Sequence, residues 1–425
     1  MVIKFEQTYR IETKKTLETV TCGMHETHAR NVGAAISQNL HISIRHLEQE
    51  LRISRNMGSE RSFSSTRNIK IQDEVPPNVP FPCNVTGGRS TEVPESVHRL
   101  RPGDIDVIAA MGDSLTAGTG VFSNNLLEIV VESRGAAGTI GGQGTWRTFL
   151  TLPNMIKEFN PNLIGYSFGN GLHFHEASQL NAAEIGAMSG DMPFMAKYLV
   201  NKIKSNPRID VKKHWKLITL MIGSNDFCLQ LCSVPSPWSL LKAHEEDMVR
   251  TLRILRDNLP RTFVALIPPP HLKALVDTRN RRNFIDCYFT TTMECPCLFG
   301  LQYRDRLQEY YEIMRRWQEL DEQIAEYSEF HTKDFTVEAE LALTHAFIPL
   351  ARDGFVDLSY LAADCFHISQ KTNALYGNIV WNNLLEPYGN KSKAWTPPYE
   401  RILCPTPERP FLTTRQNSWK NNKLR

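Results

Sequence analysis

The strongest candidate for a catalytic residue in this chain is a serine that lies between two glycines. Residues 112–118 read Gly-Asp-Ser-Leu-Thr-Ala-Gly and follow the apolar run 107–111. Such a run is typical of a buried strand, and α/β enzymes place nucleophiles on the turn just past a strand end. Ser114 is therefore the candidate nucleophile, and it needs a base and an oxyanion site elsewhere in the chain. The alternative is that Ser114 caps a helix.

A carboxylate and a histidine late in the chain could supply the base. Asp364 lies three residues before His367, a spacing that lets both side chains lie on one side of a single turn. The carboxylate would then hold one ring nitrogen of the imidazole and leave the other to take the proton of Ser114. The alternative for His367 is a surface histidine without a catalytic role.

Two further segments offer donors for a developing oxyanion. Asn225 follows the predicted strand 217–222, and its side-chain amide could donate, as could the backbone N–H of Ser114. Gly186 could donate its backbone N–H while leaving room for a substrate, with Gly190 as the fallback at this position. Asn225 could instead hold a loop through a local turn.

These blocks, in this order, resemble the GDSL family of lipases and esterases, also called SGNH hydrolases. Ser114, Gly186, Asn225 and His367 fall at the four namesake positions, and Gly186 matches through its spacing from Asn181. The resemblance implies an α/β fold, the flavodoxin-like three-layer sandwich with a central, mainly parallel sheet. It covers about residues 80–395, and four further segments are similar to the phospholipase B1-like branch: 140–146, 152–154, 159–161 and 381–387.

The resemblance implies a serine ester hydrolase that releases fatty acids from glycerophospholipids and lysophospholipids through an acyl-enzyme on Ser114. Asp364 would orient His367, and the oxyanion hole would consist of Ser114, Gly186 and Asn225. This chemistry needs no cofactor and no metal, and a lipid substrate suggests contact with a membrane surface. The alternatives are a short-chain esterase acting on soluble or carbohydrate esters, and a non-catalytic lipid-binding relative.

Other chemistry-bearing patterns are weak in this sequence. It contains no phosphate-cradling glycine loop and no dinucleotide fingerprint. His173, His175 and Glu176 could bind a metal in principle, but a polar loop without a ligand is the expected structure. The formal net charge of +2 gives no electrostatic reason to expect binding to nucleic acid.

Apolar periodicity predicts the elements that must position these residues. Strands are expected at 107–111, 217–222 and 262–268, and helices at 192–206, 240–258 and 303–327. Such alternation predicts a parallel sheet with helices on both sides. The carboxyl ends of its strands would then carry Ser114 and Asn225, which favours their meeting in space.

Composition divides the chain into three parts. Residues 1–75 are basic, with eleven Lys and Arg against seven Glu in the first 70, and are expected to be largely disordered around one helix at 39–53. A proline-rich linker then leads into the predicted hydrolase domain, residues 76–400. Residues 401–425 are expected to form a polar tail.

The cysteines indicate an oxidising compartment. Eight of the nine lie in or beside the predicted domain, and Cys83 and Cys404, which flank its ends, could be joined. Local bridges could come from Cys228 and Cys232 and from the cluster of Cys287, Cys295 and Cys297, and Cys365 is the eighth cysteine. The connectivity cannot be read from the sequence. Asn84 and Asn390 begin glycosylation sequons. The expected location is therefore secreted or membrane-associated with an atypical N-terminus, although no signal peptide or membrane-spanning run is visible. The alternative is a protein that stays inside the cell with reduced thiols.

Overall fold

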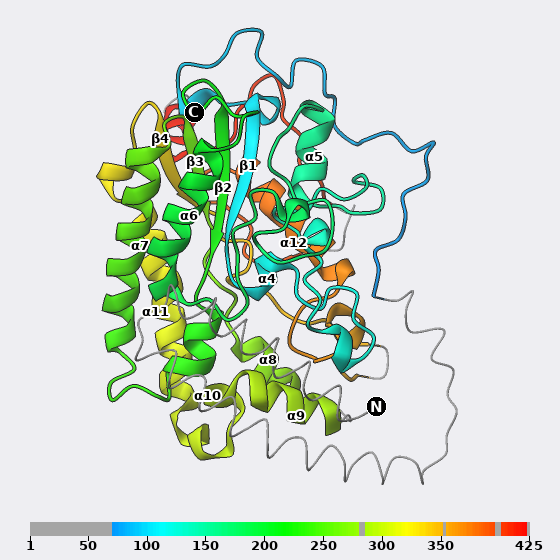
Figure 1. Ribbon diagram of the computed structural model, residues 1–425, viewed down its shortest axis with the longest axis vertical. Helices are drawn as coiled ribbons and strands as arrows, with labels where there is room; N and C mark the ends of the chain where they lie inside the picture. The colour runs from blue at the N-terminus through cyan, green and yellow to red at the C-terminus, as the bar shows by residue number, and fades with distance from the viewer. Residues whose placement is uncertain (1–69, 280–284, 352–353, 396–400, 423–425) are drawn as a thin grey trace. The chain divides into compact units, whose positions relative to one another are not determined.

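The centre of the molecule is a parallel β-sheet. The computed structural model describes residues 70–279, 285–351, 354–395 and 401–422 (Figure 1). Four strands lie in the order β1-β2-β3-β4, and every neighbouring pair is parallel. Their bounds are β1 (Ile105–Gly112), β2 (Trp215–Met221), β3 (Thr262–Leu266) and β4 (Phe335–Ala339). The predicted parallel sheet is therefore confirmed, with β4 as a strand that periodicity did not predict.

Helices follow the strands along the chain. The predicted helices at 192–206, 240–258 and 303–327 correspond to α6, α7 and α11, although α11 starts later because the 3-10 segment Leu301–Arg306 precedes it. The described helices are α4 (Ser114–Ala117), α5 (Leu152–Phe159), α6 (Met192–Lys204), α7 (Ser239–Asn258), α8 (Lys273–Arg279), α9 (Ile285–Glu294), α10 (Pro296–Phe299), α11 (Leu307–Ala325), α12 (Gln370–Leu385) and α13 (Arg415–Asn422).

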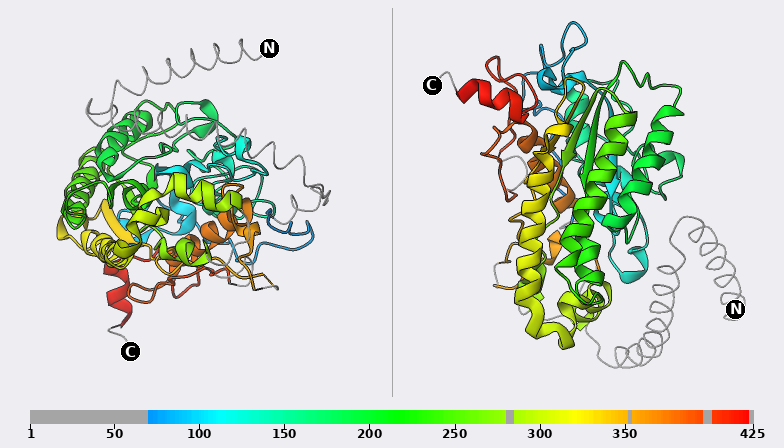
Figure 2. Two further views of the ribbon diagram at one scale, coloured as in Figure 1. Left: turned by 90° about the horizontal axis from the view of Figure 1, so that it is seen from below. Right: turned by 90° about the vertical axis from the view of Figure 1, so that its left-hand side faces the viewer.

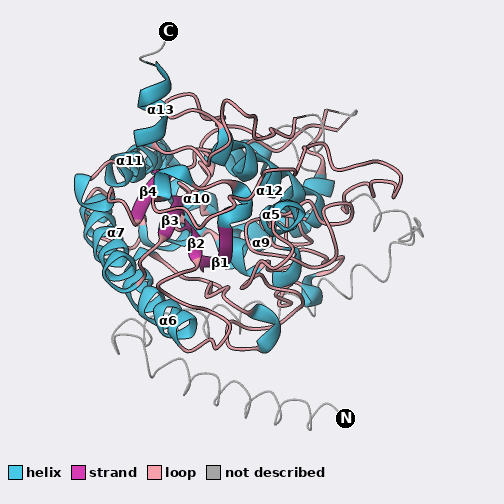
Figure 3. Cartoon of the chain, turned by 90° about the horizontal axis from the view of Figure 1, so that it is seen from above, coloured by secondary structure: helices cyan, strands magenta, loops and turns pink. Residues whose placement is uncertain are grey.

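Alternating side chains of β1 enter two separate cores, because successive residues of a strand point to opposite faces of the sheet. Ile108 and Ala110 pack with residues of α5 and α12, whereas Val107, Ala109 and Met111 pack with residues of α6 and α7. In Figure 3 the strands lie between α6, α7 and α11 on one side and α5 and α12 on the other. The three-layer α/β sandwich is thus confirmed, and burial of apolar surface on both faces holds it together.

The outer edge of β1 continues through isolated bridges. Val107 pairs with Ile164, and Ala110 pairs with Asn181, both in parallel. The second bridge matters for the site, since Ala182 N donates to Ala110 O at 2.9 Å and Glu184 N donates to Gly112 O at 3.2 Å. The chain from Asn181 onward therefore runs beside β1 toward its carboxyl end.

The described part of the chain contains four disulfides. Three of them have one cysteine in or beside α9 or α10, the helices that lie at the bottom of Figure 1 beyond the carboxyl ends of the strands. The sequence left their connectivity open, and the two suggested groups of cysteines are joined to each other. The pairs are Cys83–Cys404, Cys228–Cys295, Cys232–Cys297 and Cys287–Cys365.

Residues 401–422 pack against the sheet domain, although the sequence suggested a tail. Leu412 N donates to Leu100 O at 2.7 Å, and Trp381 Nε1 donates to Leu403 O at 2.8 Å. α13 projects at the C-terminal end of this segment (Figure 2).

Residues 1–69 of the predicted N-terminal extension, with its helix at 39–53, lie outside the described residues. Residues 70–75 were predicted to belong to that extension but pack on the domain, because Leu150 N donates to the side chain of the buried Gln72 at 2.8 Å and Val75 N donates to Arg147 O at 3.1 Å. Among the described helices, none combines the length and apolarity that crossing a membrane requires.

Candidate active site

Ser114 begins α4 immediately after β1 ends. Asp113 rather than Ser114 caps this helix, because Leu115 N donates to Asp113 Oδ1 at 3.0 Å. The hydroxyl of Ser114 therefore does not cap the helix, which was the alternative to a catalytic role. Gly112 is needed here for close packing, since a Cβ at this position would lie 2.6 Å from Met221 O on β2. The turn after β1 thus places a nearly buried serine at the carboxyl edge of the sheet.

His367 and Asp364 meet Ser114 from the far end of the chain. His367 Nε2 lies 2.8 Å from Ser114 Oγ, and His367 Nδ1 lies 2.6 Å from Asp364 Oδ2. The partners assign the tautomer: Nδ1–H donates to the carboxylate and Nε2 accepts the serine proton. This is the hydrogen-bonded arrangement of nucleophile, base and orienting acid that nucleophilic catalysis requires.

The loop that carries Asp364 and His367 is anchored at several points. Asp364 Oδ1 accepts hydrogen bonds from the backbone N–H groups of Phe366 and His367, at 2.9 and 3.0 Å. The disulfide Cys287–Cys365 joins the loop to α9, and Thr290 of α9 donates its hydroxyl to Asp364 O at 2.6 Å. The orientation of the imidazole therefore depends on α9 as well as on the local turn.

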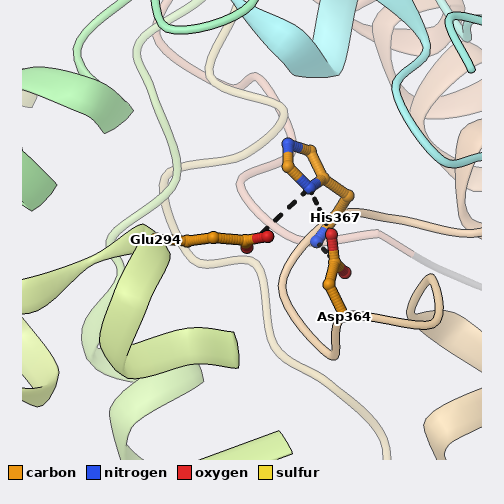
Figure 4. Close-up of side chains that lie close together, drawn as sticks. All are labelled: Glu294, Asp364 and His367. Carbon is orange, nitrogen blue, oxygen red and sulfur yellow. Dashed lines mark hydrogen bonds and ion pairs between the residues drawn. The ribbon is translucent and has the colours of Figure 1, made fainter. Parts of the chain in front are cut away.

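A second carboxyl group, which sequence reasoning missed, faces His367. Glu294 Oε2, at the end of α9, lies 4.0 Å from His367 Nδ1 (Figure 4). Burial, and then the charge of Asp364, raises the pKa of Glu294 above its ordinary value. The only sequence signal that could have placed Glu294 here is the Cys287–Cys365 bridge, and its pairing was not readable from the sequence.

The electrostatics favour a charged imidazole. Burial alone would lower the pKa of His367, but the charge and hydrogen bond of Asp364, with Glu294 and Asp113 nearby, raise it to about 9. Burial opposes ionisation of Asp364 too, yet the charge of His367 and the hydrogen bonds at its oxygens hold the pKa of Asp364 below its usual value. The pocket thus stabilises the imidazolium that forms when His367 takes the proton of Ser114.

Glu294, Asp364 and His367 also form the group of described residues whose donor atoms lie close enough to hold a metal ion, within 4.8 Å of one another. Two of those atoms already share the 2.6 Å hydrogen bond between His367 and Asp364. The group therefore suits proton transfer better than metal binding. At the other suggested metal site, His173 pairs with Glu184 at 3.3 Å and His175 Nδ1 accepts from Leu172 N.

The two predicted oxyanion segments lie together at the same sheet edge. Gly186 follows the segment that runs beside β1, and its φ of +77° is one that glycine adopts most readily. Asn225 follows β2, is half-buried, and donates from Nδ2 to Ala187 O at 2.9 Å. Since a side-chain amide carries two N–H bonds, one ties Asn225 to the Gly186 segment and the other is left for a ligand.

The structure thus brings Ser114, His367 and Asp364 into direct contact and ties Asn225 to the Gly186 segment. The backbone N–H of Ser114 lies in the first turn of α4, where helical N–H groups have no acceptor within the helix. Gly190, the fallback for Gly186, lies one segment further on, in the 3-10 turn η6 (Ser189–Asp191). All these groups belong to segments that follow the carboxyl ends of β1 and β2 or join them there.

Comparison with known proteins identifies the family. The model of the GDSL-like lipase/acylhydrolase family matches residues 108–380, which include every residue of the candidate site. Membrane-associated phospholipase B1 of Rattus norvegicus is 37% identical over 335 residues, and the proteins of that name from Mus musculus and Homo sapiens are 39% and 37% identical. Each alignment covers 77% of this chain and 22% of the relative, so the chain spans about a fifth of their length. This chain belongs to the GDSL-like lipase/acylhydrolase family.

Proposed function

We propose that this protein is a serine ester hydrolase that releases fatty acids from glycerophospholipids and lysophospholipids. The observation that carries the proposal is the chain of contacts from Ser114 through His367 to Asp364, with separations of 2.8 and 2.6 Å. The substrate class is drawn from the relatives named phospholipase B1.

In the proposed mechanism, His367 Nε2 takes the proton of Ser114 as its Oγ attacks the acyl carbonyl carbon. Backbone N–H groups of Ser114 and Gly186 and the free amide hydrogen of Asn225 donate to the oxyanion. His367 then gives the proton to the leaving alcohol oxygen, which frees the alcohol and leaves the acyl group on Ser114. A water molecule, deprotonated by His367, then attacks the acyl carbonyl carbon. His367 returns this proton to Ser114 Oγ as the bond between Oγ and the acyl carbon breaks, which releases the fatty acid and restores the serine.

Exposed apolar side chains on the site's own segments support contact with a lipid surface. Ile185 precedes Gly186, and Met293 precedes Glu294, and both are exposed. Leu127, in the 3-10 helix η3 (Leu126–Glu128), and Val130 are 88% and 76% exposed. This stretch is joined to the segment that follows Ser114, because Gly120 N donates to Val131 O. Apolar groups around the site would enter the acyl region of a membrane while the ester reaches Ser114.

An extracellular or membrane-associated location is part of the proposal. Four disulfides support it, since such bonds persist in oxidising compartments. The sequon residues Asn84 and Asn390 are both exposed, as a glycan would require. The relatives are named as membrane-associated proteins.

The test is fatty-acid release from lysophosphatidylcholine compared with acetate release from a short-chain acetyl ester, with the Ser114→Ala variant as the blank. Serine-dependent release from the lipid supports the proposal. Serine-dependent activity on the acetyl ester alone would assign a soluble-ester substrate instead. A folded, oxidised protein without activity on either ester would overturn the proposal in favour of a lipid-binding relative.

We expect Asn225→Ala to lower kcat by about 10²- to 10³-fold, because the developing oxyanion loses one preorganised donor. The matched control is Asn160→Ala, since Asn160 Nδ2 donates to Ile105 O at 2.7 Å beside the amino end of β1. Both variants lose a side-chain amide that bonds a backbone carbonyl, but only the first faces the site. Equal kcat values in the two variants would show that Asn225 is not an oxyanion donor.

We expect Glu294→Gln to move the rising limb of the kcat/KM profile to lower pH. The base must be neutral, so the rate of the wild-type protein should rise with pH and level off above the pKa of His367, about 9. The negative charge of Glu294 helps to raise that pKa, and the glutamine lacks it. Because burial raises the pKa of Glu294 itself to about 8, its charge is present on the limb near pH 9 and largely absent at pH 7. The two proteins should therefore differ most between about pH 8 and pH 9.

The profile would be measured beside Glu246→Gln, which removes a charge from an exposed position of α7 whose partner is Lys242. That control should keep the wild-type limb. A limb of Glu294→Gln that stays in place, or moves to higher pH, would mean that Glu294 does not act on His367 in the working enzyme.

A further inference from the structure

A second Ser–His–Asp chain lies inside the protein. Ser189 Oγ is 2.8 Å from His244 Nδ1, and His244 Nε2 is 2.9 Å from Asp321 Oδ1. The three residues come from η6, α7 and α11, and each is at most 3% exposed. The helices α7 and α11 run side by side along the face seen at the right of Figure 2. The indole of Trp317 covers the imidazole of His244, with ring centroids 3.9 Å apart.

This buried chain has the residue types of an active site but no access to a substrate. With Asp321 ionised, His244 donates from Nε2 to the carboxylate, and its Nδ1 accepts the hydroxyl proton of Ser189. The orientation of the ring is the reverse of that of His367, whose Nδ1 faces the acid. Because burial and Trp317 exclude water and ligands, the chain's effect on chemistry must pass through the segments it holds.

Ser189 belongs to the same segment as Gly186, one of the candidate oxyanion donors. Its backbone N–H points to both oxygens of Asp226, at 3.2 Å each, and Asp226 directly follows Asn225. Two residues before Ser189, Ala187 O accepts the amide of Asn225. The segments 186–189 and 225–226 are therefore joined at two points, and the buried chain fastens the first of them to α7 and α11.

We propose that Ser189, His244 and Asp321 form a positioning relay that fixes the oxyanion donors Gly186 and Asn225 relative to Ser114. This proposal rests on the proposed function. Donors aimed at an oxyanion act well only when they are held within a fraction of an ångström, and an error of about 1 Å can cost 10²-fold in rate. Asn225 already lies in the helical turn that leads into η7 (Asp226–Gln230), whereas Gly186 lies in a turn outside any helix or strand. A fixed point in the core therefore supplies the rigidity that the Gly186 segment lacks.

The test is Ser189→Ala, which removes the hydroxyl and leaves the backbone N–H that bonds Asp226. We expect kcat to fall about tenfold or more with little change in KM, because the donors act on the transition state and not on the bound ester. The matched control is Thr251→Val. Thr251 lies on α7, is fully buried, and loses one hydroxyl bond, to Asp247 O at 2.7 Å. That control should keep kcat.

A double-mutant cycle separates positioning from general stability. In the Asn225→Ala background, Ser189→Ala should lower kcat by a smaller factor than in the wild type, because one of the two donors that it positions is already gone and only Gly186 remains to be misplaced. An undiminished cost in that background, or an equal loss of kcat in Thr251→Val, would overturn the relay. If Ser189→Ala shows no cooperative thermal transition, Asp321→Asn, which keeps the volume of the side chain, takes its place in the same cycle with the same criteria.

The wild-type protein and Ser114→Ala belong in every assay. Serine-dependent turnover in the wild type, unaffected by the relay variants, overturns the relay alone. The absence of serine-dependent turnover in the folded wild type overturns the proposed function and the relay with it.

Discussion

Replacing Ser114 by alanine is expected to lower kcat by about 10⁵- to 10⁶-fold, the range observed when the nucleophile of a serine hydrolase is removed. Without Oγ no acyl-enzyme can form, and what remains is attack by water assisted by the oxyanion donors. The hydroxyl lies 2.8 Å from His367 Nε2, so the variant loses this one contact and keeps the cap that Asp113 makes on α4. The free energy of unfolding should change by no more than about 1–3 kcal/mol.

Release of fatty acid at saturating lysophosphatidylcholine measures the loss, and thermal unfolding confirms that the variant is folded. Ser167→Ala is the matched control, because Ser167 is fully buried and donates its hydroxyl to Ser178 O at 2.9 Å, a backbone contact outside the site. That control should keep wild-type turnover. A Ser114→Ala protein that stays within about tenfold of the wild type would rule out the acyl-enzyme, since a nucleophile's loss costs far more than that.

Three strands and three helices could be predicted from the sequence because their patterns are local. β1 and β2 are apolar runs that enter two cores, and α7 and α11 repeat apolar residues at helical spacing. The meeting of Ser114 with His367 could also be predicted, although 253 residues separate them. Parallel strands all end at one edge, and the family resemblance indicated which residues gather there.

Other elements could not be predicted because their stability comes from distant partners. α12 carries buried asparagines, so it lacks an apolar face that a pattern could reveal. Asn382 donates to Arg401 O and accepts from Leu403 N, and Asn373 accepts from Gly138 N. β4 likewise buries polar side chains, among them Glu338. From the sequence alone, each of these polar side chains would be expected at the surface. Its hydrogen-bond partner comes from a distant segment and is present only in the folded chain.

The same reasoning explains the missed part of the site. Glu294 lies 70 residues before Asp364, and the contact depends on how α9 is fastened to the Asp364 loop. Ser189 and His244 belong to segments whose meeting follows from the packing of α6, α7 and α11. Spacing along the chain can indicate pairs such as Asp364 and His367, but it cannot indicate which helices will lie behind them.

Asp364→Asn is expected to lower kcat by about 10⁴-fold while the fold is kept. Oδ1 of residue 364 accepts two backbone N–H groups, from Phe366 and His367, and an asparagine oxygen would keep this place. Its NH₂ group would then face His367 Nδ1. A donor at that position makes Nδ1 the acceptor and puts the ring proton on Nε2, where it blocks transfer from Ser114. The variant should therefore bind lipid normally and fail in the proton transfer step.

The matched control is Asp357→Asn, because Asp357 caps the turn before this loop by accepting from Ser359 N at 3.0 Å and is not among the groups that shift the pKa of His367. It should keep turnover near the wild-type level. Raising the pH should not restore Asp364→Asn, since the defect lies in the position of the proton and not in its number. Should Asp364→Asn keep more than about a tenth of wild-type kcat, Glu294, 4.0 Å from the same nitrogen, becomes the orienting carboxylate. Adding Glu294→Gln to that variant would then remove the remaining turnover.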